Sequence, residues 1–167
     1  GVEPERAVEL LQTFSGLSRR TEVLGTLGDA VVLSDYAHHP TEIAATITAL
    51  RERYTKSRIA VLFEAHMLER LVTFKKDYVK ALTMADTIAL YPVFLPTGRR
   101  SEYAQEAQSH LDDLNNTLLA QQAHVVIIPG PAELPAIVSD LATTNNLVVG
   151  LTAGNLDREL RSIVNAG

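Results

Sequence analysis

The stretch Ile59-Ala60-Val61-Leu62-Phe63 decides how this chain folds. It is a continuous apolar run without alternating polar residues, which is typical of a strand that is covered on both faces. After it, helical and strand-like patterns alternate: helices are expected over about 68–82, within 101–122, and over 132–143 and 156–165, and strands over about 87–91, 124–128 and 147–151. The alternation predicts an α/β fold with a mainly parallel open sheet and helices on both faces, as in Rossmann-like proteins.

Before the central run, the pattern is shorter and richer in branched residues. Residues 21–24 and 30–33 read as two short strands, with Gly25, Gly28 and Asp29 as turn residues between them. Two strands joined so closely form a hairpin. We therefore expect an N-terminal antiparallel hairpin at the margin of the sheet.

Two further helices complete the pattern. Residues 4–13 have helical spacing, and an amphipathic helix is expected after Pro40. We predict that residues 1–16 are the tail of a preceding domain or a linker helix, and that residues 17–167 form one domain. Because the chain opens at Gly1 and not at Met, we expect an upstream part to be missing.

Composition excludes several classes of protein. The 167 residues include no cysteine, which removes disulfides, thiol nucleophiles and thiolate metal sites and suits a cytoplasmic protein. A net charge of -5 spread over interspersed charges argues against a nucleic-acid partner, since nucleic-acid binders usually display a basic face. No apolar run approaches the roughly 20 residues of a membrane helix, so no membrane association is expected.

Ligands of open parallel sheets collect at the carboxyl ends of the strands, where loops and helix N-termini meet. Five segments are expected at that edge: residues 35–41, 64–70, 91–100, 129–133 and 152–155. The region 92–113 is the least regular part of the chain, and we expect a long loop followed by a helix there.

The first of these segments holds Asp35, Tyr36, His38 and His39. The carboxylate of Asp35 follows a strand and can accept hydrogen bonds from ribose hydroxyls or hold a cation; alternatively, it forms an N-cap or an Asx turn before the helix. The two adjacent imidazoles point to opposite sides of an extended segment. One is expected to face the site while the other packs or caps, and no metal site is predicted.

The other segments offer cationic groups and a glycine. His66 and Arg70 follow the central strand and suit an anion or a carboxylate substrate, although a solvated helix start fits the composition equally well. Gly154 and Asn155 lie at the start of the last helix, whose N–H groups favour an anion. The pair Arg19-Arg20 is a further candidate, or an ordinary surface pair if no partner meets it.

Four blocks together resemble the C-terminal domain of the Mur ligases, which are ATP-dependent, amide-forming ligases of peptidoglycan precursor synthesis. The blocks are F-S-G-L-S-R-R (14–20), D-Y-A-H-H-P-T-E (35–42), F-E-A-H (63–66) and T-A-G-N (152–155). The second block is similar to that of the family members that add L-alanine. A related member that recycles murein tripeptide carries F-A-H-H-P-T instead, so Tyr36 and Glu42 favour the alanine-adding members.

The resemblance implies roles for the matching residues. Asp35 would help to hold the ribose of ATP, and Tyr36 and His38 would approach the amino acid and the muramoyl substrate. The implied cofactors are ATP and Mg²⁺. The implied partners are UDP-N-acetylmuramate, L-alanine and ATP, together with N-terminal and central domains.

Two family patterns are altered in this chain. The family's F-Q-P-H-R-Y-T-R loop turns a His and two Arg toward the substrate; here His66 and Arg70 are kept, but Met67 stands at the first Arg and removes a charged fork. The family's G-A-G-N-[IL]-G pattern has Thr152 and Asp157 in place of two glycines. The resemblance therefore leaves the affinity for the substrate open.

The family activates a carboxylate as an acyl phosphate, using a G-x-x-G-K-[ST] loop of its central domain. No such motif occurs in these residues. We therefore expect no catalytic residue in this chain alone; it would be a mobile lid that closes over ATP and delivers the amino acid.

Three alternatives stay open. The first is a stand-alone or degenerate binding module of the same fold, and the second is the corresponding domain of the tripeptide-recycling ligase. The third is an unrelated doubly wound enzyme such as a dehydrogenase, which lacks support because no G-x-G-x-x-G follows a strand.

Overall fold

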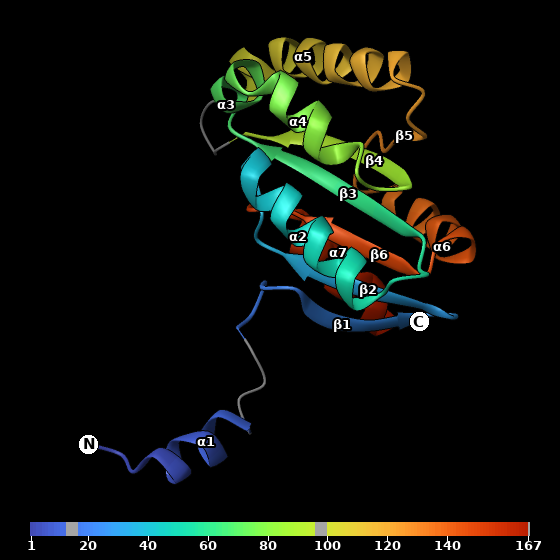
Figure 1. The fold of residues 1–167 in the computed structure, drawn as a ribbon. Helices are drawn as coiled ribbons and strands as arrows, with labels where there is room; N and C mark the ends of the chain where they lie inside the picture. The colour runs from blue at the N-terminus through green and yellow to red at the C-terminus, as the bar shows by residue number, and fades with distance from the viewer. Residues whose placement is uncertain (13–16, 96–99, 167) are drawn as a thin grey trace.

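The computed structural model describes residues 1–12, 17–95 and 100–166, with the backbone alone for residues 11–12 and 100–102. Within these ranges, six strands form one sheet in the order β1-β2-β6-β3-β4-β5 (Figure 1). Strands β1 (Glu22–Leu27) and β2 (Ala30–Asp35) are antiparallel, and the other neighbouring strands are parallel. The prediction of a mainly parallel sheet with an N-terminal antiparallel hairpin is confirmed.

The remaining elements alternate along the chain as expected. The strands are β3 (Ile59–His66), β4 (Thr87–Phe94), β5 (Val125–Ile127) and β6 (Leu147–Leu151). The helices are α1 (Pro4–Gln12), α2 (Pro40–Arg53), α3 (Leu68–Thr73), α4 (Lys75–Leu82), α5 (Arg100–Ala120), α6 (Leu134–Thr144) and α7 (Leu156–Ala166). The boundary predicted between residues 16 and 17 stays a prediction, because residues 13–16 lie outside the described ranges.

Helices cover both faces of the sheet. Helices α2, α4 and α5 lie on one face, and α6 and α7 lie on the other (Figure 1). Alternate residues of β3 supply the two cores: Val61 and Phe63 pack under α2 and α4, while Ala60 and Leu62 pack under α6 and α7. Each of the three larger side chains, Val61, Leu62 and Phe63, contributes roughly 1.5–3 kcal/mol when fully buried, so this strand stabilises both layers.

The helix predicted over residues 68–82 is divided in two. Phe74 ends α3 and begins α4 with a backbone that is not helical (φ -108°, ψ 21°). Its ring lies 4.9 Å from the ring of His39, in an edge-to-face contact. The interruption therefore comes with a contact between segments distant in sequence, which a local pattern does not reveal.

The assignment of Gly25 to the hairpin turn was wrong. Gly25 lies inside β1 at an irregularity of the β1–β2 register, with φ +153°, and the turn consists of Gly28 and Asp29. A Cβ atom at Gly25 would lie 2.5 Å from the Cγ1 atom of Val164. Glycine is required at this position because α7 packs closely against the hairpin.

Strand β4 continues past Pro92, where the sequence suggested that a loop begins. Strand β5 pairs with β4 only as far as Leu90, so the missing N–H of Pro92 breaks no ladder on that side. On the other side, β4 still pairs with β3 as far as Phe94. Most of the region expected to be a long loop is therefore strand or helix: β4 ends at Phe94 and α5 begins at Arg100, while residues 96–99 lie outside the described ranges.

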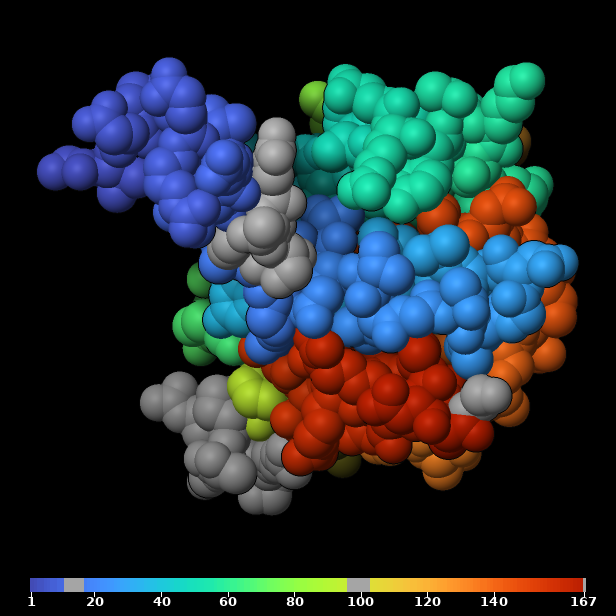
Figure 2. Space-filling view, turned by 90° about the horizontal axis from the view of Figure 1, so that it is seen from below, coloured from blue at the N-terminus to red at the C-terminus, as the bar shows by residue number. Residues whose placement is uncertain are grey.

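Helix α7 lies alongside the hairpin on the face that Figure 2 presents, red beside blue. Arg161 of α7 donates hydrogen bonds of 3.1 and 2.6 Å to Glu22 of β1. Arg161, followed by the backbone N–H of Arg19, lowers the pKa of Glu22 to about 2. In the ranges that the structure describes, no helix is both long and apolar enough to cross a membrane.

Candidate functional site

Four rings lie in a row at the carboxyl edge of the sheet, and we call Tyr36, His38, His66 and Phe94 the aromatic row. Neighbouring ring centroids are 5.3 Å apart for Tyr36 and His38, 5.7 Å for His38 and His66, and 5.2 Å for His66 and Phe94. The first two contacts are edge-to-face, whereas the rings of His66 and Phe94 are nearly parallel, at 9°. The row joins the loop after β2 to the ends of β3 and β4, because parallel strands end at one edge.

The adjacent histidines separate as predicted. His38 turns into the row, and its Nδ1 lies 2.9 Å from the carbonyl oxygen of Tyr36. His39 is the N-cap of α2: its Nδ1 accepts the N–H two residues on, at 3.3 Å, and its ring packs on Phe74. The carboxylate of Glu42 accepts the N–H groups of both histidines, at 3.1 and 3.0 Å, which completes a capping box. His39 therefore supports the helix and does not enter the row.

A buried phenol fixes the backbone beneath His38. The hydroxyl of Tyr78 donates to the carbonyl oxygen of His38 at 2.7 Å, and burial raises the pKa of Tyr78 to about 12. The phenol stays protonated at physiological pH and remains a donor. The position of His38 is thus defined both by α4 and by the start of α2.

Asp35 lies beneath the row with only 4% of its surface exposed. Its Oδ1 accepts the N–H of Ala37 at 2.8 Å and the hydroxyl of Thr46 at 3.3 Å. Its Oδ2 accepts the N–H and the hydroxyl of Thr21, at 2.7 and 3.1 Å. The predicted Asx turn is confirmed, and the alternative of an N-cap is wrong because His39 caps the helix. Contact of Asp35 with the ribose of ATP stays a prediction.

His66 and Arg70 meet at the end of β3 and each carries a nitrogen that lacks a partner. The Nδ1 of His66 and the Nη1 of Arg70 are buried without a hydrogen bond to the described residues. Burial lowers the pKa of His66, and the nearby His38 and Arg70 act in the same direction. A buried donor without a partner costs about 1–3 kcal/mol, so a ligand that supplies acceptors would recover this cost. Met67 between them has φ 74° and an exposed side chain.

Arg19 and Arg20 flank the other end of the row. The Cζ atoms of Arg19 and Arg20 lie 4.6 and 5.8 Å from the centroid of the Tyr36 ring. Arg19 also donates from Nη2 to the carbonyl oxygen of Thr152 at 2.6 Å. Its buried Nε makes no hydrogen bond to the described residues, since the Oδ1 of Asp157 is 3.9 Å away. Arg19 is thus a third group with unused hydrogen-bonding capacity, after His66 and Arg70.

The segment that carries Arg19 has a strained backbone. Arg19 and Thr21 have φ values of 56° and 49°, in the left-handed region that non-glycine residues rarely adopt. Such residues cost on the order of 1–3 kcal/mol each and persist where their surroundings fix them. Here the carbonyl oxygen of Arg19 accepts the N–H of Tyr36 at 2.7 Å, while Asp35 and Glu22 bind the N–H groups of Thr21 and Arg19. These hydrogen bonds fix the backbone of residues 19–21 and so the position from which the Arg19 side chain extends.

The N-terminus of α7 binds the carboxylate of Glu64, a side chain of the same chain. The N–H groups of Asn155 and Leu156 donate to the carboxylate of Glu64 at 3.3 and 3.2 Å, and the hydroxyl of Thr152 donates to it as well. A Cβ atom at Gly154 would lie 2.5 Å from Glu64 Oε2 and 2.7 Å from the ring of Phe94. Burial raises the pKa of Glu64, while these hydrogen bonds oppose that rise. Gly154 and Asn155 therefore lie behind the row and pack against Glu64.

Comparison with known proteins identifies the fold family. The family described as "Mur ligase, glutamate ligase domain" matches residues 19–154. The chain belongs to this family. The match includes every residue of the aromatic row and the strained segment at Arg19.

Curated relatives and solved structures agree with this Mur ligase assignment. The UDP-N-acetylmuramate–L-alanine ligase of Bifidobacterium adolescentis is 36% identical over 123 residues, which are 74% of this chain and 22% of that protein. Similar structures include a UDP-N-acetylmuramate-alanine ligase from Thermotoga maritima (TM-score 0.71, 22% identity) and a murein peptide ligase from Psychrobacter arcticus (TM-score 0.68, 21% identity). Each is similar over 99% of this chain and 34% of the other, and at such identities the likeness concerns the fold.

Sequence reasoning missed two residues of this Mur ligase domain. Glu64 was part of the F-E-A-H block but was given no role, because its hydrogen-bond donors lie about 90 residues later in the chain. Phe94 lies two residues after Pro92, which was taken to end the strand. Both residues bind or pack across the sheet edge, and local patterns do not predict such contacts.

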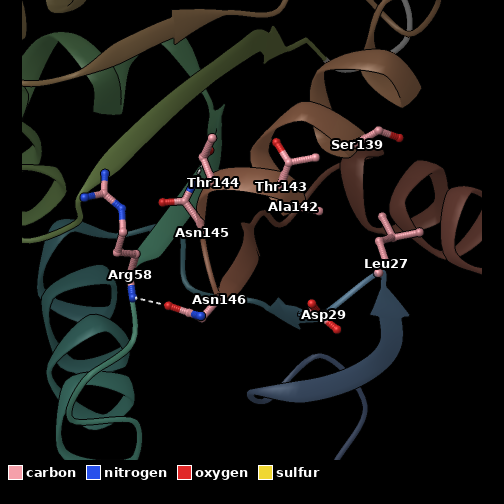
Figure 3. A pocket seen from close by; sticks show the side chains of 10 residues that line it. Leu27, Asp29, Arg58, Ser139, Ala142, Thr143, Thr144, Asn145 and Asn146 are labelled. Atoms are coloured by element: carbon pink, nitrogen blue, oxygen red, sulfur yellow. Dashed lines mark hydrogen bonds between the residues drawn. The ribbon is translucent and has the colours of Figure 1, made fainter.

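A shallow hollow of about 600 Å³ lies at the opposite, amino edge of the Mur ligase domain (Figure 3). The side chains that line it come from the hairpin turn, the start of β3 and the end of α6: Leu27, Asp29, Arg58, Ser139, Ala142, Thr143, Thr144, Asn145 and Asn146. Asn146 accepts the backbone N–H of Arg58 at 2.9 Å, drawn as a dashed line. None of the predicted site residues lines this hollow.

The described ranges contain no preformed metal site of three or more ligands. No group of three or more His, Asp or Glu residues there is placed to hold a metal ion. The carboxylates around the row, those of Asp35, Glu42 and Glu64, each already accept two or more hydrogen bonds within the chain.

Proposed function

We propose that this chain is the C-terminal domain of an ATP-dependent ligase that joins L-alanine to UDP-N-acetylmuramate in peptidoglycan precursor synthesis. The aromatic row with its cationic flanks is the substrate side of the site. The chain spans about a fifth of the length of the curated relatives it matches. The activity, the substrates and the other domains are therefore part of this proposal.

The observation that carries the proposal is the set of buried nitrogens without partners on Arg19, His66 and Arg70. The guanidiniums of Arg19 and Arg70 donate hydrogen bonds to carboxylates or phosphates, and the neutral ring of His66 donates from Nδ1 in the tautomer that carries its proton there. UDP-N-acetylmuramate carries a carboxylate and a diphosphate, and L-alanine carries a carboxylate. The row beside these groups offers ring faces against which apolar parts of a substrate can pack.

ATP and Mg²⁺ would be held mainly by a central domain that contains the phosphate loop. The chemistry they supply is the activation of the muramate carboxylate as an acyl phosphate, which the amine of alanine then attacks. In this domain Asp35, with Arg19 and Tyr36 beside it, is the group proposed to meet the ribose. Its oxygens already accept four hydrogen bonds, so a ribose hydroxyl would have to share one of them or replace Thr46, whose bond is the longest at 3.3 Å.

The neighbouring histidines provide the test with a matched control. In a protein where this domain follows a phosphate-loop domain, His38→Ala is expected to lower the turnover of UDP-N-acetylmuramate and L-alanine about 100-fold, because the substrate loses a positioning group. His39→Ala is expected to keep the turnover while losing about 1 kcal/mol of stability as a helix cap. The measurements are ATP-dependent ADP release and urea unfolding. Unchanged ADP release in His38→Ala would refute the assignment of the row.

The same assay separates the proposal from its rivals. The structural likeness to a murein peptide ligase makes the tripeptide-recycling ligase the second candidate, although this chain has Tyr36 where the F-A-H-H-P-T pattern has Phe. ADP release with UDP-N-acetylmuramate and a free murein tripeptide, but not with UDP-N-acetylmuramate and L-alanine, would establish that candidate. Absence of ADP release with either amine, together with tight binding of UDP-N-acetylmuramate to the chain, would indicate a binding module.

A further inference from the structure

Glu64 is a buried carboxylate that the proposed function does not use. Only 2% of its surface is exposed, and it lies at the end of β3, two residues before His66. Its three hydrogen-bond donors are the hydroxyl of Thr152 and the N–H groups of Asn155 and Leu156. Thr152 and Asn155 belong to the loop that joins β6 to α7, and Leu156 is the first residue of α7. These three hydrogen bonds offset the free-energy cost of burying the carboxylate. They also join the loop to β3.

One end of this loop supports the histidine end of the aromatic row. Gly154 fits between Glu64 and Phe94 so closely that a methyl group there would meet both side chains, at 2.5 and 2.7 Å. Phe94 in turn lies flat on His66, with a centroid distance of 5.2 Å and an angle of 9°. A shift of the loop would therefore move Phe94 and change its stacking on His66.

The other end of the loop supports the tyrosine end of the row. The carbonyl oxygen of Thr152 accepts the Nη2 of Arg19 at 2.6 Å, and the guanidinium of Arg19 lies 4.6 Å from the ring centroid of Tyr36. Thr152 also binds the N–H of Gly154 through its hydroxyl oxygen, at 2.9 Å, so both ends of the loop move as one unit. The row is thus held at both ends by a loop that Glu64 holds.

We infer that Glu64 is a positioning residue, which sets the geometry of both ends of the aromatic row through the loop 152–155. The functional meaning of this arrangement rests on the proposed function, since the row is the substrate side only if that proposal holds. The geometry itself does not depend on it.

The carboxylate form of the side chain is essential to this role. A carboxylate only accepts hydrogen bonds, and the loop presents only donors to it. In Glu64→Gln the shape is kept, but one of the two accepting oxygens becomes an NH₂ group that faces a donor. The loop must then shift or lose a bond, which makes this isosteric variant a direct probe of positioning.

The experiment follows the ring signals of the chain by two-dimensional ¹H–¹³C NMR. In Glu64→Gln, the His66 ring signals are expected to move downfield, because nuclei above the face of Phe94 are shielded and lose that shielding. The Tyr36 signals are expected to move in the same variant. The titration midpoint of His66 is expected to rise toward its ordinary value, because the ring gains contact with water.

Matched variants separate positioning from a general loss of stability. Thr152→Val, which removes the hydroxyl, is expected to move the same signals, whereas Thr152→Ser, which keeps it, is expected to leave them in place. Val138→Ala removes buried apolar volume from the core under α6 and α7 and is expected to destabilise the domain. It changes no residue of the loop 152–155. It is expected to leave both signals unchanged.

The inference is overturned if Glu64→Gln leaves the signals of His66 and Tyr36 in place, or if Val138→Ala moves them equally. The NMR result does not require ligase activity. A shift of both rings, together with unchanged ADP release by His38→Ala in a protein where this domain follows a phosphate-loop domain, would support the positioning role and refute the proposed function. Loss of ADP release in His38→Ala, together with unmoved ring signals in Glu64→Gln, would do the reverse.

Discussion

The two edges of the sheet use polar side chains in different ways. At the amino edge, the polar groups around the hollow pair within the chain: Asn145 donates to Leu141 and Thr144, and Asp86 accepts the N–H of Ile59 at 2.7 Å. At the carboxyl edge, three buried nitrogens have no partner in the described ranges. The amino edge thus uses its polar groups to close the fold, whereas the carboxyl edge holds three buried nitrogens that no described residue pairs.

The sharpest test of this difference is Arg70→Met at the carboxyl edge. The variant removes a guanidinium whose Nη1 has no partner, so stability is expected to stay constant or rise. Affinity for UDP-N-acetylmuramate is expected to fall roughly 10- to 150-fold, the equivalent of a charge-assisted bond of about 1.5–3 kcal/mol. Calorimetric titration of the chain measures the affinity, and urea unfolding measures the stability. Unchanged affinity would remove Arg70 from the proposed site.

The opposite result is expected for Asn145→Ala at the amino edge. Asn145 is 5% exposed and exchanges hydrogen bonds with Leu141, Thr144 and Thr87. Its loss is expected to cost about 1–3 kcal/mol of unfolding free energy, because partners remain buried without their bonds. The same titration is expected to give an unchanged affinity. A weaker affinity in a variant that is still fully folded would show that the two edges are coupled.

A smaller effect is expected from the pH dependence of stability. Burial lowers the pKa of His66 in the folded chain, so the unfolded chain binds the proton first as the pH falls. The stabilising contribution of the neutral imidazole is therefore complete above the ordinary histidine pKa of about 6.5 and is lost as the pH falls from there through the folded pKa. His66→Gln is expected to flatten this part of a stability–pH curve measured by urea unfolding. An identical curve in the variant would contradict the assignment.

Much of the fold could be predicted because it depends on patterns within single segments. The apolar run of β3 predicted a strand between two helical layers, and that strand supplies both cores. The break at Phe74 and the glycine at position 25 could not be predicted. Each depends on a partner distant in sequence: the ring of His39 for Phe74 and the side chain of Val164 for Gly25.

The site was partly predictable for a related reason. Tyr36, His38 and His66 follow strands that were expected to be parallel, and parallel strands bring such residues to one edge. The different orientations of His38 and His39 could be predicted from the alternation of side chains in an extended segment alone. The role of Glu64 was not predictable, because its donors lie about 90 residues later in the chain and nothing near Glu64 signals them.

The strained turn at Arg19 and Thr21 is hydrogen-bonded to the end of β2 and packs as part of the sheet. Thr21 provides two of the four hydrogen bonds to the buried carboxylate of Asp35. A domain cut at Glu22, the first residue of the first strand, would keep the whole sheet but leave Oδ2 of that carboxylate without those two donors. Anyone who transplants the domain into another protein, or swaps it between relatives, should therefore keep residues 19–21 together with the strands.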